Sequence, residues 1–187
     1  MRIVISCMDR RLNEYLEKNF NDGNTVFVRN AGANVNSLKN TISLLKKADE
    51  ILILPHTDCG AMGVVERALK GEKLPEGLEP LISPFRKFVG YSKPQLEQVN
   101  LQVQESTLKG MVKAKITSEL IRTEELNAPP SSDNVALVLS PSTRRYSEII
   151  PHDMMYKTYV IQTENDGDID VLIAKEFLKV KEVRKVV

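Results

Sequence analysis

The sequence predicts an α/β fold in which a mainly parallel central β-sheet is flanked by helices. Three short apolar runs, at 2–6, 25–28 and 51–54, are rich in β-branched and other apolar residues, and each is followed by apolar residues at helical spacing. Strands that alternate with helices form parallel sheets with right-handed crossovers. The chain has 187 residues, of which 42% are hydrophobic, so we expect residues 1–187 to form a single domain with a buried core.

The first half of the chain contains the three best-defined strands. Each apolar run stops at a polar or turn-forming segment, and the turn at 21–24 (NDGN) separates the first helix from the second strand. In chain order, we expect strand 2–6, helix 12–20, strand 25–28, helix 35–48, strand 51–54 and helix 63–70.

The second half is predicted from periodicity alone. After a loop at 71–94, apolar residues from 96 to 121 recur at helical spacing and predict one long amphipathic helix. We then expect a fourth strand at 135–139, a fifth at 156–162, and a last helix that is capped at 165–168 and reaches 183. The expected sheet order is 2-1-3-4, with the fifth strand at an edge. We expect no internal repeat.

Three motifs directly follow the first three strands: CMDRR, RNAG and HTDCG. If the first strand lies between the second and third, the sheet order reverses there and a crevice opens at the carboxyl ends of the strands. Cys7, His56 and Cys59 then meet in one place. Two thiolates and one imidazole are zinc ligands, and three protein ligands leave a fourth position open, as in catalytic zinc sites. We therefore predict one Zn²⁺ per subunit, bound by these three residues.

Two charged residues close to Cys7 suit catalysis at such a metal. Two thiolates neutralise Zn²⁺, so water on the metal is harder to ionise than at a three-histidine site. Asp9 can accept a hydrogen bond from this water, and Arg11 can hold Asp9 by a charge-assisted fork and keep it off the metal. We predict that Asp9 and Arg11 are catalytic. The alternative is a structural ion pair that ties down the loop.

The motifs C-x-D-x-R, R-N-A-G and H-x-x-C-G, in this order, resemble those of the β-class carbonic anhydrases. The HTDCG form is similar to the small-subunit branch of that class, which is itself similar to carbon disulfide and carbonyl sulfide hydrolases. The resemblance implies reversible hydration of CO₂ to bicarbonate and a proton by zinc-bound hydroxide, in a homodimer or higher homo-oligomer. It also implies that Arg29, Asn30, Ala31 and Gly32 support the substrate pocket and the subunit contact.

Several alternatives stay open. The segment 29–32 could equally be a turn in which Gly32 permits a tight backbone. Asp58 is expected to cap the helix that follows it, rather than to support the metal. The alternative functions are hydrolysis of CS₂ or COS at the same zinc site, and a zinc-binding relative without catalytic activity.

Composition argues against several other classes of protein. The 26 basic and 25 acidic residues give a net charge of +1, which produces no field that would attract nucleic acid or an anionic membrane. No apolar run reaches about 18 residues, and the N-terminus becomes charged too early for a signal peptide. We expect a cytoplasmic protein that acts on a small molecule. In a reducing compartment, metal binding by the two cysteines is favoured over a disulfide.

Overall fold

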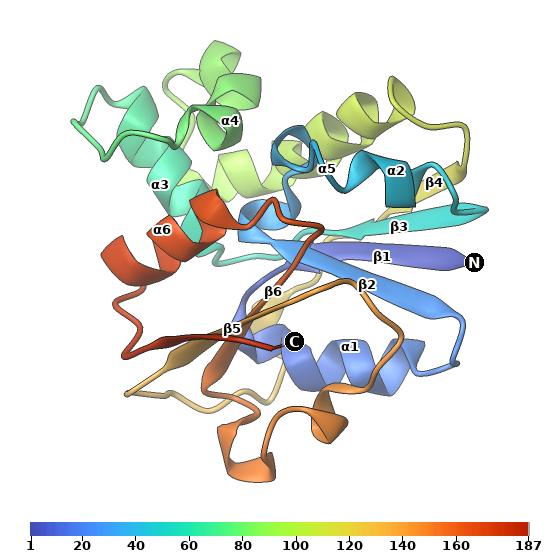
Figure 1. Ribbon diagram of the computed structural model, residues 1–187. Coiled ribbons are helices and arrows are strands. Elements are labelled where there is room, and N and C mark those ends of the chain that lie inside the picture. The colour runs from blue at the N-terminus through green and yellow to red at the C-terminus, as the bar shows by residue number, and fades with distance from the viewer. Residues whose placement is uncertain (187) are drawn as a thin grey trace.

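A seven-stranded β-sheet with helices on both faces forms the centre of the computed structural model, which describes residues 1–186 (Figure 1). The predicted α/β class is confirmed. The order of the strands across the sheet is β4-β3-β1-β2-β6-β5-β7. In chain order, the strands are β1 (Arg2–Cys7), β2 (Thr25–Asn30), β3 (Glu50–Leu54), β4 (Lys115–Ser118), β5 (Val135–Leu139), β6 (Thr158–Gln162) and β7 (Val183–Lys185).

The sheet consists of two parallel blocks. One block is β4-β3-β1-β2 and the other is β6-β5-β7, and within each block all neighbours are parallel. The blocks meet where β2 and β6 run antiparallel, with Arg29 opposite Gln162. The predicted placement of the first strand between the second and third is confirmed, and it positions the crevice at the carboxyl ends of β1 and β3.

Helices cover both faces of the first block. In Figure 1, α1 lies on one face, and α2 and α5 lie on the other. Alternate side chains of β1 are buried in separate cores, since Ile3 and Ile5 belong to one cluster and Val4 to the other. Burial on both faces explains the continuous apolar runs in the sequence. The helices are α1 (Asn13–Phe20), α2 (Ile42–Leu45), α3 (Gly60–Leu69), α4 (Glu79–Ile82), α5 (Lys93–Lys109) and α6 (Asp168–Glu176).

The predicted order 2-1-3-4 is wrong in its last place. The neighbour of β3 is β4, whereas the predicted fourth strand, 135–139, is β5 and lies beyond β2 and β6. The predicted helix at 96–121 concealed β4, because Ile116 and Leu120 continue the helical spacing of the residues before them. In the structure α5 ends at Lys109, before Gly110, and β4 alternates exposed and half-buried side chains as an edge strand does.

Four other predicted elements differ from the structure. The fifth predicted strand, 156–162, contains β6, which lies inside the sheet and not at an edge. The predicted last helix ends at Glu176, and the residues beyond it form β7. The predicted loop at 71–94 contains α4 and a 3₁₀ turn, and the predicted helix at 35–48 is reduced to a 3₁₀ turn and α2. Within residues 1–186, no helix is both long enough and apolar enough to cross a membrane.

Candidate metal centre

Three buried ligand-type side chains meet at the carboxyl ends of β1 and β3. Cys7 is the last residue of β1, and His56 and Cys59 follow β3, its parallel neighbour. The two sulfur atoms and an imidazole nitrogen lie within 4.8 Å of one another, and this is the only such group found in the described part of the chain. The structure thus brings together the three residues that we predicted as zinc ligands.

The imidazole of His56 is oriented to bind a metal. Its Nδ1 lies 2.7 Å from the carbonyl oxygen of Thr57, so Nδ1–H donates to that oxygen and Nε2 is the nitrogen left to bind a metal. Nε2 is buried and has no hydrogen-bond partner. Metal-binding histidines commonly donate one ring N–H to a carbonyl and bind the metal through the other nitrogen. The orphaned Nε2 beside two sulfur atoms therefore fits a zinc ion.

The pKa values of Cys7, His56 and Cys59 depend on one another. The hydrogen bond between the two cysteines lowers the pKa of Cys7 and raises that of Cys59. Burial lowers the pKa of His56, but the charges of Cys7 and Asp9 and the hydrogen bonds to Cys7 and Thr57 together outweigh burial and raise this pKa to about 9. A bound cation would replace these protons, because thiolates and a neutral imidazole are the binding forms.

Backbone contacts fix the positions of both sulfur atoms. The Gly32 N–H lies 3.4 Å from the Cys7 sulfur, and the Cys59 N–H donates to Oε2 of Glu97 at 2.7 Å. Glu97 lies on α5 and is 5% exposed. The sequence predicts α5 only as a helix that packs against the core, but through Glu97 this helix also fixes the position of Cys59.

Asp9 and Arg11 form the fork expected from their spacing. Arg11 Nε donates to Oδ1 of Asp9 at 3.0 Å, and Nη2 donates to Oδ2 at 2.7 Å. Burial would raise the pKa of Asp9, but the hydrogen bonds and charge of Arg11 outweigh it and lower the pKa to about 2. Oδ2 of Asp9 lies 3.8 Å from Nε2 of His56. An ionised carboxylate is thus held next to the metal-binding atoms and tied away from them.

Asp58 extends this pair and does not cap α3. Its Oδ2 accepts a hydrogen bond from Arg11 at 3.0 Å, and its Oδ1 accepts one from Lys93 at 2.8 Å. The helix α3 begins at Gly60 without a side-chain cap, so the expected capping role of Asp58 is wrong. Asp58 has a φ of 53°. Its left-handed backbone conformation turns the chain between the two ligand positions of the HTDCG motif.

The Arg29 side chain fixes the backbone from Cys7 to Asp9, which we call the metal loop. This side chain is fully buried and donates to the carbonyl oxygens of Cys7 at 2.9 Å and Asp9 at 2.8 Å. A third hydrogen bond goes to Oδ1 of Asn13 at 2.7 Å. No carboxylate takes part in these bonds, so the guanidinium positions backbone between Cys7 and Asp9 through its fixed fork of donors.

The rest of the RNAG segment is a turn packed against the centre. Asn30 closes the turn, because its Oδ1 accepts the Asn34 N–H at 2.8 Å. Gly32 has a φ of 74°, and a Cβ there would lie 3.2 Å from Cβ of Ala61. The structure thus shows the turn that Gly32 permits and brings the Gly32 N–H to the Cys7 sulfur, while a role of this segment at the substrate pocket or the subunit contact stays a prediction. The Ala31 N–H donates to Oδ1 of Asp170 at 2.7 Å.

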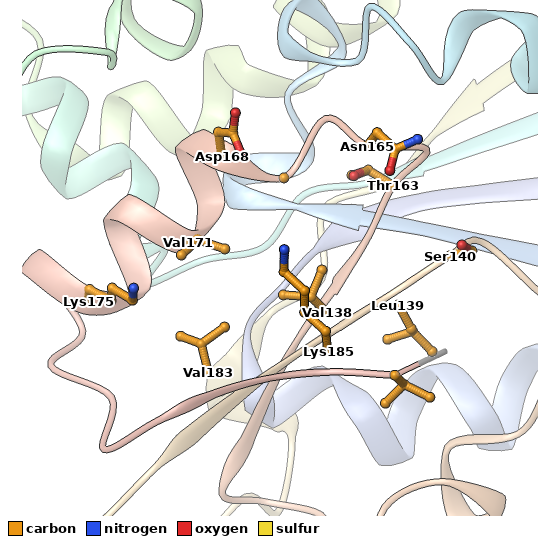
Figure 2. Close-up of a pocket in the computed structure, with 12 residues that line it drawn as sticks. Val138, Leu139, Ser140, Thr163, Asn165, Asp168, Val171, Lys175, Val183 and Lys185 are labelled. Atoms are coloured by element: carbon orange, nitrogen blue, oxygen red, sulfur yellow. The ribbon is translucent and has the colours of Figure 1, made fainter.

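A small pocket of about 20 Å³ opens beside the cluster, enough for about one water-sized molecule. Its walls are mostly apolar. They consist of Cys7, Met8, Asp9, Ala31, Gly60, Ala61, Tyr159, Ile173 and Leu178. A much larger cavity, of about 690 Å³, lies elsewhere, at the ends of β5 and β6 (Figure 2).

Sequence reasoning missed the contributions of α5 and of the region after β5. Glu97, Asp170, Tyr159 and Ile173 stand in no motif. For Glu97 and Asp170 the nearest sequence signal is an acidic residue within an apolar helical face, and Tyr159 and Ile173 carry no such signal. Burial raises the pKa of Asp170 to about 8, although the Ala31 N–H opposes this rise. Only the folded chain shows that these side chains surround Cys7.

Comparison with known proteins identifies the family. A model of the family described as carbonic anhydrase matches residues 2–138, which is more than half of the chain. The chain belongs to the carbonic anhydrase family. The matched region includes Cys7, His56 and Cys59 and ends within β5. The resemblance that the three motifs indicate is therefore confirmed. No curated protein matches the chain.

Solved structures of carbonic anhydrases and of a carbon disulfide hydrolase are similar to this chain. An apo form of carbon disulfide hydrolase is 22% identical, with a TM-score of 0.45, over 66% of this chain and 74% of that one. The β-carbonic anhydrase CafA of Aspergillus fumigatus is 16% identical, with a TM-score of 0.49, over 70% and 76%. β-Carbonic anhydrase isoform I of Trichomonas vaginalis is 21% identical, with a TM-score of 0.45, over 67% and 79%.

Proposed function

We propose that this chain is a zinc-dependent carbonic anhydrase that catalyses the reversible hydration of CO₂ to bicarbonate and a proton. The observation that carries the proposal is the buried Cys7, His56 and Cys59 cluster with the Asp9–Arg11 pair beside it. Membership of the carbonic anhydrase family supports the same reaction. Zinc, when bound by these three residues, would lower the pKa of a water on it from about 15.7 toward neutrality.

Asp9 would orient the attacking water. Its carboxylate is ionised near neutral pH, because its pKa is about 2, and it can only accept hydrogen bonds in that form. Arg11 occupies both carboxylate oxygens, so Asp9 is fixed in direction and kept from binding the metal. The water oxygen then adds to the carbon of CO₂, one C=O electron pair moves to oxygen, and a proton leaves to solvent.

The pocket suits a small uncharged substrate. Its volume of about 20 Å³ is too small for most metabolites. Met8, Ala31, Ala61 and Ile173 line it with apolar surface, which favours a molecule without charge. The lining therefore favours small uncharged molecules, the class to which CO₂ belongs and also CS₂ and COS, the substrates of the alternative activity.

Stopped-flow measurement of CO₂ hydration, on protein of known zinc content, tests the proposal. We expect turnover at about pH 7 that increases at about pH 8.5, because two thiolates make water on the metal harder to ionise. Zinc-loaded protein that is inactive at both pH values contradicts carbonic anhydrase activity. Release of H₂S from CS₂ or COS by that protein would identify the hydrolase alternative, and no turnover of any of these substrates would identify a binding protein.

Three further expectations belong to the same proposal. We propose that residues 1–187 form one zinc domain with one Zn²⁺ per chain. A homodimer or higher homo-oligomer stays a prediction, which the mass of the protein in solution tests. A cytoplasmic location also stays a prediction.

A further inference from the structure

The two parallel blocks of the sheet are arranged alike on either side of the β2–β6 boundary. β1 lies between β2 and β3, and β5 lies between β6 and β7, with all four pairings parallel. The registers also match. Arg2 faces Thr25, Val135 faces Thr158, and the second residue of each pair lies the same number of positions further along the chain.

Two backbone hydrogen bonds are repeated across this boundary. The Phe27 N–H donates to the Ser142 carbonyl at 3.1 Å, and the Val160 N–H donates to the Met8 carbonyl at 3.0 Å. Phe27 and Val160 occupy the same place in their strands, and Met8 and Ser142 lie in the loops that directly follow β1 and β5. Each block thus presents the same two groups to the other, as subunits do about a two-fold axis.

A sequence pattern repeats at the same two places. The segment 6–11 (SCMDRR) has a counterpart at 140–145 (SPSTRR), with serine and both arginines retained. The counterpart begins one position later relative to the strand register, which hides the repeat from a simple comparison. Proline stands in the place of Cys7 and threonine in the place of Asp9, so the metal-binding thiol and the carboxylate are both missing.

We infer that residues 135–178 (the second unit) are a copy of residues 2–45 (the first unit) that has lost the metal ligand Cys7, and that the second unit completes the pocket of the metal centre within the same chain. The role of the pocket in substrate selection rests on the function proposed above. The duplication and the origin of the pocket walls do not depend on it.

The second unit supplies three walls of the small pocket. Tyr159 comes from β6, Ile173 from α6, and Leu178 from the segment after α6. Ile173 is 1% exposed, and Cδ2 of Leu178 lies 3.4 Å from the position that a Cβ on Gly60 would occupy. These contacts bring the second unit directly against the start of α3, which follows the metal-binding segment from His56 to Cys59.

The second unit also positions the loop that holds Cys7. Oδ1 of Asp170, on α6, accepts the Ala31 N–H at 2.7 Å, and the next N–H, that of Gly32, points to the sulfur of Cys7. On the other side, the ring of Tyr146 lies 5.1 Å from the guanidinium of Arg29. Asp170 and Tyr146, which support the loop around Cys7 from two sides, therefore both belong to the second unit.

The second block of the sheet has a hollow of its own at the carboxyl ends of its strands. The cavity of about 690 Å³ in Figure 2 lies at the carboxyl ends of β5 and β6, beside Ser140 and Thr163. Lysine side chains, Lys175 and Lys185, line it in place of thiols and imidazole. No histidine and no cysteine lines it, so one chain should bind one metal ion and not two.

Cobalt-substituted protein titrated with thiocyanate tests the inference. The visible spectrum of Co²⁺ reports occupancy beside the metal, whether or not the protein turns over CO₂. We expect one Co²⁺ per chain, and Ile173→Ala and Leu178→Ala should each weaken thiocyanate binding by about tenfold without loss of metal. The matched control is Val171→Ala, since Val171 also lies on α6 but lines the other cavity, and it should bind as the unchanged protein does.

The pocket should also be independent of association between chains. The thiocyanate dissociation constant should stay constant over an about 100-fold range of protein concentration. Wild-type binding by Ile173→Ala and Leu178→Ala, a second metal ion per chain, or binding that disappears on dilution each overturns the inference. The expected cobalt and thiocyanate results from a protein without CO₂ hydration would instead overturn the proposed function and leave the inference standing.

Discussion

The first and second units share strand order, register and an Arg-Arg loop, yet only the first contributes a metal ligand, Cys7. In the first unit, Arg11 is about four-fifths buried and holds Asp9 beside the metal-binding atoms. In the second, Arg145 is half-exposed and lies 3.5 Å from Glu17 at the surface. Two identical residues thus have different roles, because the residue two positions earlier is aspartate in one unit and threonine in the other. The comparison shows that the strand arrangement of this fold can be kept when the residues that bind metal are lost.

Replacing Cys7 by serine should produce the largest difference between the units. A serine hydroxyl is a poor zinc ligand, so we expect zinc content to fall from one per chain to near zero and CO₂ hydration to disappear. Pro141→Ala, at the corresponding position of the second unit, is the control and should retain zinc. Metal analysis of both purified variants measures the effect. Retention of stoichiometric zinc by Cys7→Ser would show that the ligand assignment is wrong.

Replacing Arg11 or Arg145 by alanine should produce the second-largest difference between the units, measured as CO₂ turnover. Arg11→Ala frees Asp9 from its fork, so we expect turnover to fall by about 10- to 100-fold while zinc is retained. Arg145→Ala removes only a surface pair and should leave turnover unchanged. Steady-state CO₂ hydration with measured zinc content checks both variants. Equal turnover in the two variants would mean that the Asp9–Arg11 pair only holds the loop in shape and does not contribute to catalysis.

Asp170, the contact from the second unit to Ala31, should make stability depend on pH in zinc-free protein. Its pKa is about 8 when folded and 3.8 in the reference state, so its stabilising effect is complete below about pH 3.8 and is lost as the pH rises toward 8. Between about pH 5 and 7, the free energy of unfolding should fall relative to Asp170→Asn by about 1.4 kcal/mol per pH unit. Denaturant unfolding of both proteins measures this difference. Parallel pH profiles would contradict the raised pKa.

Gly23 and Gly32 have the same backbone conformation, so their alanine variants separate the cost of crowded packing from the cost of backbone strain. Gly32 and Gly23 have φ values of 74° and 73°, but only Gly32 has side-chain atoms where a Cβ would lie. We expect Gly23→Ala to cost about 1 kcal/mol of stability and Gly32→Ala about 1 kcal/mol more, with weaker zinc binding. Denaturation midpoints at equal m-values give the comparison. Equal costs would mean that the neighbours of Gly32 move aside freely.

The metal-binding half of the molecule could be predicted from the sequence. β1 and β3 are short apolar runs that end at their motifs, and this pattern alone places Cys7 and His56 at one edge of the sheet. Asp9 and Arg11 are two positions apart, and local geometry alone allows their fork. These are short-range signals, and the predicted site follows from them.

The walls of the pocket depend on long-range packing and could not be predicted. β4 continues the helical spacing of α5, and β7 follows α6 without a strong break, so periodicity assigned both to helices. The antiparallel meeting of β2 and β6 has no local signal, because it joins segments far apart in the chain. Tyr159 and Ile173 reach the metal centre only through that contact. The repeat was missed because the retained residues are few and shifted by one position.

The location of the metal is the most direct test of the difference between the two units. Crystals of the zinc-loaded protein, measured at the zinc absorption edge, would show each zinc ion as a peak of anomalous scattering. We predict one peak per chain, between the sulfur atoms of Cys7 and Cys59 and Nε2 of His56, and none in the cavity beside Ser140. The absence of a peak at the three side chains, or a second peak at the ends of β5 and β6, would contradict this account.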